Sequence, residues 1–194
     1  MTLPTISCTP CVSFAAYLIS RYEKNVDLDI ITPSALGHDL KVYPKDHPDR
    51  YASQRDSAEI MGTILYAVDI FPKYKIPSVQ TCILECSFSN ETVPKMLESR
   101  ILQDADKLES TGAISIMRTF ASTGQMMRPF YNPDDPFCEN RDPNSMMYAL
   151  DLVYQRLLKV PERMHTEKGR ELAEKGNYFL IQFLDEVQLE LKRK

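Results

Sequence analysis

His38 and Asp39 are adjacent in the chain and carry two kinds of donor atom that divalent cations accept as ligands. An imidazole nitrogen and a carboxylate oxygen side by side can both bind one metal ion. The pair follows the apolar stretch Ala35-Leu36-Gly37, so we expect it at the end of a helix. A lone His-Asp pair more often caps a helix or forms an ion pair, so this dipeptide by itself is a weak indication of a metal site.

A second group of polar side chains occupies residues 103–109. It places three carboxylates and one ammonium within seven residues: Asp104, Asp106, Lys107 and Glu109. The apolar spacing predicts a helix here, with a core-facing stripe formed by Ile101, Ala105, Leu108, Gly112 and Ile116. Asp104 and Asp106 flank this stripe on opposite sides, so the periodicity does not decide which carboxylate points inward. Asp104 and Glu109 are expected to be solvated charges or partners of Lys107 and Arg100.

Positive side chains follow the His-Asp pair in a loop that contains Pro44 and Pro48. The loop and its edges carry Lys41, Lys45, His47 and Arg50. Such side chains bind phosphate oxygens through charge-assisted hydrogen bonds, but a charged loop with prolines is just as often solvated surface. The residues alone leave both alternatives open, and the same holds for Arg118.

Helices must position these groups, because apolar residues recur at three- and four-residue spacing along most of the chain. The pattern covers residues 11–22, 30–40, 53–68, 79–88, 96–120, 146–158 and 172–191. Ser53 is a plausible N-cap of its helix, and Thr166 is a plausible N-cap of the last one. No convincing pair of strands is present. The sequence therefore predicts an all-α protein, a compact bundle of about six or seven helices.

Length and charge exclude several classes of function. The chain has 194 residues, enough for one hydrophobic core, and no long linker divides it, so one domain is expected. Its 23 basic residues are mixed with 27 acidic ones, which argues against a long nucleic acid as partner. No apolar run reaches the length of a membrane span, and no signal peptide is recognisable. We therefore expect a soluble, cytoplasmic protein without a membrane partner.

The five cysteines are expected to be reduced thiols, because their number is odd and the chain is too long to depend on disulfides. They include the pairs Cys8-x-x-Cys11 and Cys82-x-x-x-Cys86. A structural zinc site made by these four thiolates is only weakly indicated, since the second pair has helical spacing.

Several ordered motifs resemble the HD superfamily of metal-dependent phosphohydrolases, most closely its bacterial single-domain nucleotide pyrophosphohydrolases. The resemblance runs from about Cys8 to Leu191. Its most specific parts are Asp104-Ala105-Asp106-Lys107-Leu108-Glu109, Gly112-Ala113-Ile114 and Arg118-Thr119-Phe120. Further matches are Asp46-His47-Pro48-Asp49-Arg50, Asp135-Pro136-Phe137, Tyr148-Ala149-Leu150-Asp151 and Leu157-Leu158-Lys159-Val160-Pro161. The resemblance implies one HD-type domain over residues 1–194 that lacks the family's opening segment.

The resemblance also implies a ligand set. His38 and Asp39 fall on the family's His-Asp pair, and Asp106 falls on its last metal-binding Asp, so these three are expected to meet in one pocket and to be catalytic. The family's first His lies four residues before Val12, where this chain has Cys8. Cys8 is therefore a possible fourth ligand, and a thiolate there would favour zinc.

The function implied is hydrolysis of a phosphate ester or nucleotide, with cleavage of a nucleoside triphosphate to the monophosphate and pyrophosphate as the specific expectation. The cofactor would be a divalent ion: Mn, Mg, Zn or Fe. The residues expected to bind substrate are His47, Arg50, Lys107 and Arg118. The alternative is a catalytically silent relative that acts as a binding or scaffolding module, because Cys8 replaces the first ligand.

Overall fold

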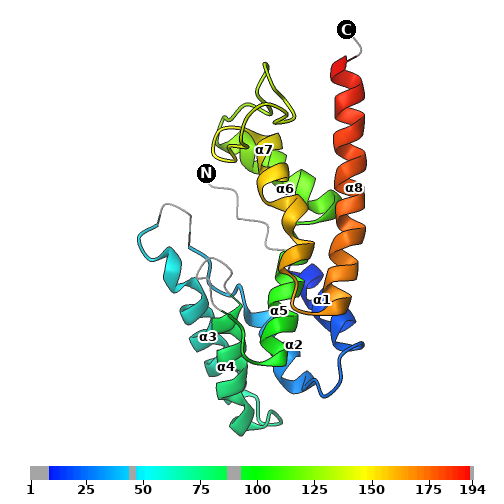
Figure 1. The fold of residues 1–194 in the computed structure, drawn as a ribbon. Helices are drawn as coiled ribbons and strands as arrows, with labels where there is room; N and C mark the ends of the chain where they lie inside the picture. Colours follow the sequence, from blue (N-terminus) through cyan, green and yellow to red (C-terminus); the bar gives the residue numbers. More distant parts are fainter. Residues whose placement is uncertain (1–8, 44–46, 87–92, 193–194) are drawn as a thin grey trace. The chain divides into compact units, whose positions relative to one another are not determined.

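The computed structural model describes residues 9–43, 47–86 and 93–192 (Figure 1). These residues form eight α-helices and no strand, which confirms the predicted all-α fold class. The α-helices are α1 Thr9–Ser20, α2 Leu28–Gly37, α3 Ser53–Ala67, α4 Ile76–Glu85, α5 Leu97–Leu108, α6 Gly112–Gln125, α7 Ala149–Gln155 and α8 Glu167–Lys192. Short 3-10 helices are η1 Arg50–Ala52, η2 Lys73–Lys75, η4 Leu157–Lys159 and η5 Pro161–Arg163. None of the described helices is both long and apolar enough to span a membrane.

The chain divides into two compact units, residues 1–106 and residues 107–194. In the first unit α2 packs against α1 and α4, and α4 packs against α3. Their facing sides are apolar and fully buried, and include Val12, Ile19, Ile31, Ala35, Ala58, Val79, Cys82 and Ile83. Helix α5 is tied in at two places: the Glu98 carboxylate accepts a hydrogen bond from the Asp27 N–H (2.8 Å), and the Gln103 amide donates to the Glu85 carbonyl (3.2 Å).

The end of α2 lies close to α3 at Gly37, the residue before His38. A Cβ atom at this position would stand 2.9 Å from Cγ of Met61, closer than real Cβ contacts. Glycine is therefore required for the observed approach of the two helices. The close packing helps to keep the following residue, His38, in the protein interior.

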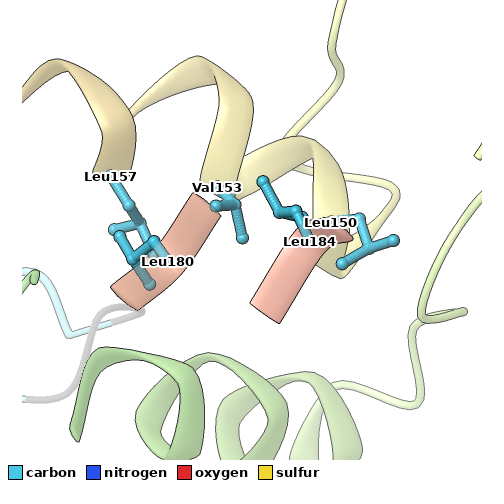
Figure 2. Packing of buried hydrophobic residues seen from close by; sticks show 5 residues of the cluster. All are labelled: Leu150, Val153, Leu157, Leu180 and Leu184. Atoms are coloured by element: carbon cyan, nitrogen blue, oxygen red, sulfur yellow. The ribbon is translucent and has the colours of Figure 1, made fainter. Parts of the chain in front are cut away.

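In the second unit α6 packs along α8, which is drawn orange to red in Figure 1, and α7 contacts α6. Figure 2 shows the buried cluster that α7, η4 and α8 share, made by Leu150, Val153, Leu157, Leu180 and Leu184. The predicted cap of the last helix is confirmed, because the Thr166 hydroxyl accepts a hydrogen bond from the Gly169 N–H (3.0 Å). Ser53, by contrast, is the first residue of α3, and its hydroxyl donates to the Arg50 carbonyl instead of capping.

Two of the predicted helices differ from the structure. The stretch 96–120 is broken into α5, which ends at Leu108, and α6, which begins at Gly112. One continuous right-handed helix cannot pass through Gly112, because its φ is +66. The stretch 146–158 becomes helical only at Ala149, and Met146 and Met147 are 78% and 53% exposed. Apolar periodicity alone does not report such breaks, since local backbone hydrogen bonds decide them.

Candidate functional site

His38 forms the C-cap of α2 and is buried, with 3% of its surface exposed. Its Nδ1 atom lies 2.9 Å from the carbonyl oxygen of Ala35. A carbonyl only accepts hydrogen bonds, so Nδ1 must carry the proton in this contact. In the neutral ring, Nε2 then has a free lone pair. Metal-binding histidines are commonly oriented in this way, with one nitrogen bonded to the backbone and the other left for the ion.

The Nε2 atom of His38 is buried and, within the described part of the chain, has no hydrogen-bond partner. The Asp39 carboxylate lies next to it, with Oδ2 at 3.6 Å from Nε2. A buried acceptor without a partner costs free energy unless something binds it. An imidazole lone pair beside a carboxylate is a donor set that fits a divalent cation. The structure thus brings together two of the predicted metal ligands in a suitable form.

Within the part of the chain that the structure describes, no third ligand is gathered with this pair. Among residues 9–43, 47–86 and 93–192, no three His, Cys, Asp or Glu side chains are gathered closely enough to hold a metal ion. Asp106 is half-buried on α5, in the same unit as His38. Cys8 lies outside the described residues. Ligation by Asp106 and by Cys8 therefore stays a prediction.

Asp104 on α5 and Glu109, which follows α5, are both more buried than a solvated charge would be. Asp104 has no exposed surface, which excludes the solvated charge among its two expected roles; pairing with Lys107 or Arg100 stays a prediction. Glu109, in the second unit, forms an ion pair with Arg118, and its side chain is also largely buried. The helical turn of α5 selects Asp104 as the inward carboxylate, which periodicity left open.

The two predicted substrate-binding residues of the loop after α2 are both accessible. His47 stacks on Tyr43, with ring centroids 4.8 Å apart, and is 38% exposed at its side chain. Arg50 begins η1, and its guanidinium lies 4.4 Å from the ring centroid of Tyr51. Their assignment to substrate stays a prediction.

Known proteins resemble this chain in sequence over part of its length and in structure over nearly all of it. No protein-family model matches the chain. The uncharacterized protein YpgQ of Bacillus subtilis is 28% identical over 98 residues, which are 50% of this chain and 42% of YpgQ. The sequence match therefore spans less than half the length of that relative.

Solved structures match far more of the chain. A crystal structure of B. subtilis YpgQ in complex with ADP is similar with a TM-score of 0.69 and 24% identity, over 95% of this chain and 85% of that one. The crystal structure of an HD-superfamily hydrolase from Bacillus thuringiensis is similar with a TM-score of 0.73 and 24% identity, over 96% and 85% of the two chains. A predicted HD-superfamily hydrolase from an uncultured Thermotogales bacterium gives 0.60 and 24%, over 95% and 80%. The chain has the HD-superfamily fold. This confirms the resemblance indicated by the motifs.

Lys107 and Arg118 are the other two residues predicted to bind substrate. Both lie in the second unit and have partners there. The Lys107 ammonium donates to the Arg163 carbonyl (2.7 Å) and contacts Nε2 of His165 (3.1 Å). Arg118 is paired with Glu109. A role in substrate binding would require these contacts to be shared or exchanged, and it stays a prediction.

The cysteines of this HD fold are not all reduced. Cys82, Cys86 and Cys138 are free thiols. Cys11 is disulfide-bonded, so the expectation of five reduced thiols is wrong at this position. Among the described residues no zinc site made of cysteines is present.

Sequence reasoning missed the groups that orient the functional side chains. The Ala35 carbonyl fixes the tautomer of His38, and no side-chain pattern could reveal a backbone contact. Asp56 was also missed, although a signal existed: Ser53, Asp56 and Ser57 share one face of α3 at three- and four-residue spacing. This polar face points to the segment after α2. The Ser53 and Ser57 hydroxyls accept hydrogen bonds from the N–H groups of Tyr43 and Lys41, and the Asp56 carboxylate accepts one from the Tyr43 hydroxyl.

Proposed function

We propose that the protein is a metal-dependent phosphohydrolase that acts on a nucleotide, cleaving a nucleoside triphosphate to the monophosphate and pyrophosphate. The observation that carries this proposal is the buried lone pair of His38 Nε2, which has no partner among the described residues and lies beside the Asp39 carboxylate. The HD-superfamily fold supports it, since structures that share this fold include proteins described as HD-superfamily hydrolases.

In this proposal His38, Asp39 and Asp106 hold a divalent ion of the series Mn, Mg, Zn or Fe, and Cys8 is a possible further ligand. Such an ion, when bound, neutralises phosphoryl charge and makes water acidic enough to act as a nucleophile near neutral pH. The chain itself contributes the orientation of the ligands. The Ala35 carbonyl holds the His38 ring with its lone pair toward Asp39, so little reorganisation is needed on binding.

A nucleotide is the proposed substrate because YpgQ, which is similar in fold, has been crystallised with ADP. The accessible imidazole of His47 and guanidinium of Arg50 are suited to phosphate oxygens. Both follow His38 in the same unit of the chain. Lys107 and Arg118 stay predicted substrate-binding residues of the second unit.

The test is to measure the metal content of the purified protein and its release of phosphate and pyrophosphate from a panel of nucleotides. His38→Ala should lower metal occupancy and abolish hydrolysis. His47→Ala is the matched variant for the metal readout, because it removes a histidine without removing a proposed ligand. Equal metal content in wild type and His38→Ala would contradict the proposed site.

A second candidate function is that of a binding module without catalysis. Its specific support is that His38 and Asp39 are joined by no third ligand in the described part of the chain, and that Cys8 stands where the family has a His. This alternative predicts nucleotide binding without metal-dependent turnover. The nucleotide panel separates the two candidates when binding and product release are measured on the same sample.

A further inference from the structure

The segment after the His-Asp pair is fastened to α3 by hydroxyl groups. The Lys41 N–H donates to the Ser57 hydroxyl (3.0 Å), which in turn donates to the Lys41 carbonyl (3.2 Å). The Tyr43 N–H donates to the Ser53 hydroxyl (3.3 Å). Ser53 and Ser57 are one helical turn apart, so together they fix the direction of residues 41–43 along the helix.

The Tyr43 ring is fixed at its far end as well. Its hydroxyl donates a 2.7 Å hydrogen bond to Oδ2 of Asp56, and Oδ1 of Asp56 accepts from Nε of Arg55 (3.0 Å). The hydrogen bonds from Tyr43 and Arg55 lower the pKa of Asp56, and the bond to Asp56 raises the pKa of Tyr43. At neutral pH the contact therefore joins a phenol donor to an ionised carboxylate. The Tyr43 ring has little freedom to rotate.

Two nitrogen-bearing side chains lie against this fixed ring. The Lys41 ammonium is 5.1 Å from the ring centroid, and the His47 ring stacks at 4.8 Å with an interplanar angle of 23°. Both side chains keep access to solvent, whereas Tyr43 is half-buried. The ring thus holds two accessible donors at one place.

The tautomer of His47 is opposite to that of His38. The backbone N–H of Asp49 donates to Nδ1 of His47 (3.1 Å), so Nδ1 is the acceptor and Nε2 carries the proton of the neutral ring. His38 has its proton on Nδ1 and a lone pair on Nε2. One histidine is therefore prepared to bind a cation and the other to donate to an anion.

We propose that Tyr43, fixed by Asp56, is a positioning residue that orients Lys41 and His47 as a pair of donors for a phosphate group of the substrate. This inference rests on the proposed function, because it assigns the part of that site which receives the anion. The charge at the surface agrees with it. Lys41, Arg50 and Arg55 supply three positive charges near Asp49 and Asp56, and the Asp56 carboxylate is already engaged by Tyr43 and Arg55.

The test uses inorganic pyrophosphate as the probe, with the full chain at pH 8 in a buffer that contains a chelator, and measures affinity by calorimetry. Tyr43→Leu removes the ring and should weaken binding about ten-fold, since two charge-assisted contacts lose their support. Tyr43→Phe keeps the ring and loses only the bond to Asp56, so it should recover most of that loss. Tyr74→Leu, which changes an exposed tyrosine in η2, is the control and should bind like wild type.

Nitrogen NMR of the histidine rings gives a readout that a general loss of stability would not mimic. Wild type should show His47 with its proton on Nε2, and addition of pyrophosphate should shift the His47 signals. In Tyr43→Leu this shift should be largely lost. Circular dichroism and a cooperative thermal transition should show that the variant is still folded. His38→Ala should lose metal binding and keep pyrophosphate binding in the chelator, so the two proposals can fail separately.

Two results would overturn the inference. One is a wild-type protein that does not bind pyrophosphate without metal. The other is a folded Tyr43→Leu variant with unchanged affinity and an unchanged His47 response. Should Tyr43→Leu fail to fold, Lys41→Ala and His47→Ala provide the decision, since each must weaken pyrophosphate binding at least about three-fold for the donor pair to stand.

Discussion

Arg141 and Asp151 form a two-point ion pair in the second unit of the chain. Nη1 of Arg141 lies 2.5 Å from Oδ2 of the carboxylate, and Nη2 lies 2.8 Å from Oδ1. Asp151 has no exposed surface and also accepts from the Asn144 N–H (2.6 Å). This pair anchors the long connection between α6 and α7 to the first turn of α7, which explains how residues 126–148 keep a defined path without regular structure.

Removal of the charge on Asp151 should strongly destabilise the protein. Asp151→Asn leaves the Arg141 guanidinium without its carboxylate, and breaking a buried pair on one side costs about 3–5 kcal/mol. Urea unfolding measures the change in the free energy of unfolding. Asp134→Asn, an exposed aspartate of the same connection, is the control and should stay within about 0.5 kcal/mol of wild type. Equal losses in the two variants would show that the pair has no special role.

Stability should also fall in acid because of this carboxylate. Burial acts to raise the pKa of Asp151, but hydrogen bonds from Arg141 and from the Asn144 N–H outweigh it, so the pKa is lower than the ordinary value. A carboxyl with a lowered pKa stabilises the fold above its unfolded value of about 3.9 and loses this contribution as the pH falls through the folded value. We expect the thermal unfolding temperature to decrease as the pH falls below about 4, and to decrease less steeply in Asp151→Asn. Parallel curves for the two proteins would contradict this.

The free thiols of Cys82, which is buried, and Cys138, which is half-buried, should react slowly in the native state. Burial raises the pKa of Cys82 to about 12, and burial together with the Asp151 carboxylate raises the pKa of Cys138 to about 11. The thiolate is the reactive form, and at pH 8 only about one Cys138 side chain in a thousand is ionised. Alkylation with iodoacetamide, followed by peptide mass spectrometry, should label both residues much faster in urea. Asp151→Asn should speed native labelling of Cys138 more than that of Cys82, whereas fast labelling of wild type would rule out the raised pKa values.

Asp106 is assigned to the metal by the motif, but among the described residues it is not gathered with His38 and Asp39 into a metal-binding group. Asp106→Ala should lower both metal occupancy and nucleotide hydrolysis, by about 100-fold or more for a direct ligand. Asp69→Ala, an exposed aspartate after α3, is the control. Cys8→His should maintain or raise occupancy if position 8 supplies a ligand, because imidazole binds the same divalent ions. Robust metal-dependent hydrolysis in Asp106→Ala would place the active site elsewhere.

Much of the molecule could be predicted from its amino-acid sequence. The period of the apolar residues predicted an all-α fold, since burial of one helical face leaves a direct trace in the sequence. The order of the motifs indicated the HD superfamily, and the similar solved structures confirm the fold. His38 and Asp39 were noted for residue type and adjacency and were assigned to the metal by the resemblance; in the structure Nε2 of His38 lies 3.6 Å from Oδ2 of Asp39.

The tertiary structure decided what depends on backbone direction and on contacts between distant residues. The predicted helix over residues 96–120 is divided into α5 and α6 before Gly112. The apolar period does not reveal this break, because the positive φ of Gly112 leaves the spacing of the apolar residues unchanged. Asp104 is buried and Asp106 is half-buried, a choice that needs the neighbours of α5 as well as its own spacing. The opposite tautomers of His38 and His47 follow from a carbonyl at Ala35 and an N–H at Asp49. Every residue except proline carries both of these backbone groups, so only their position in space, and no feature of the sequence, tells which one meets an imidazole ring.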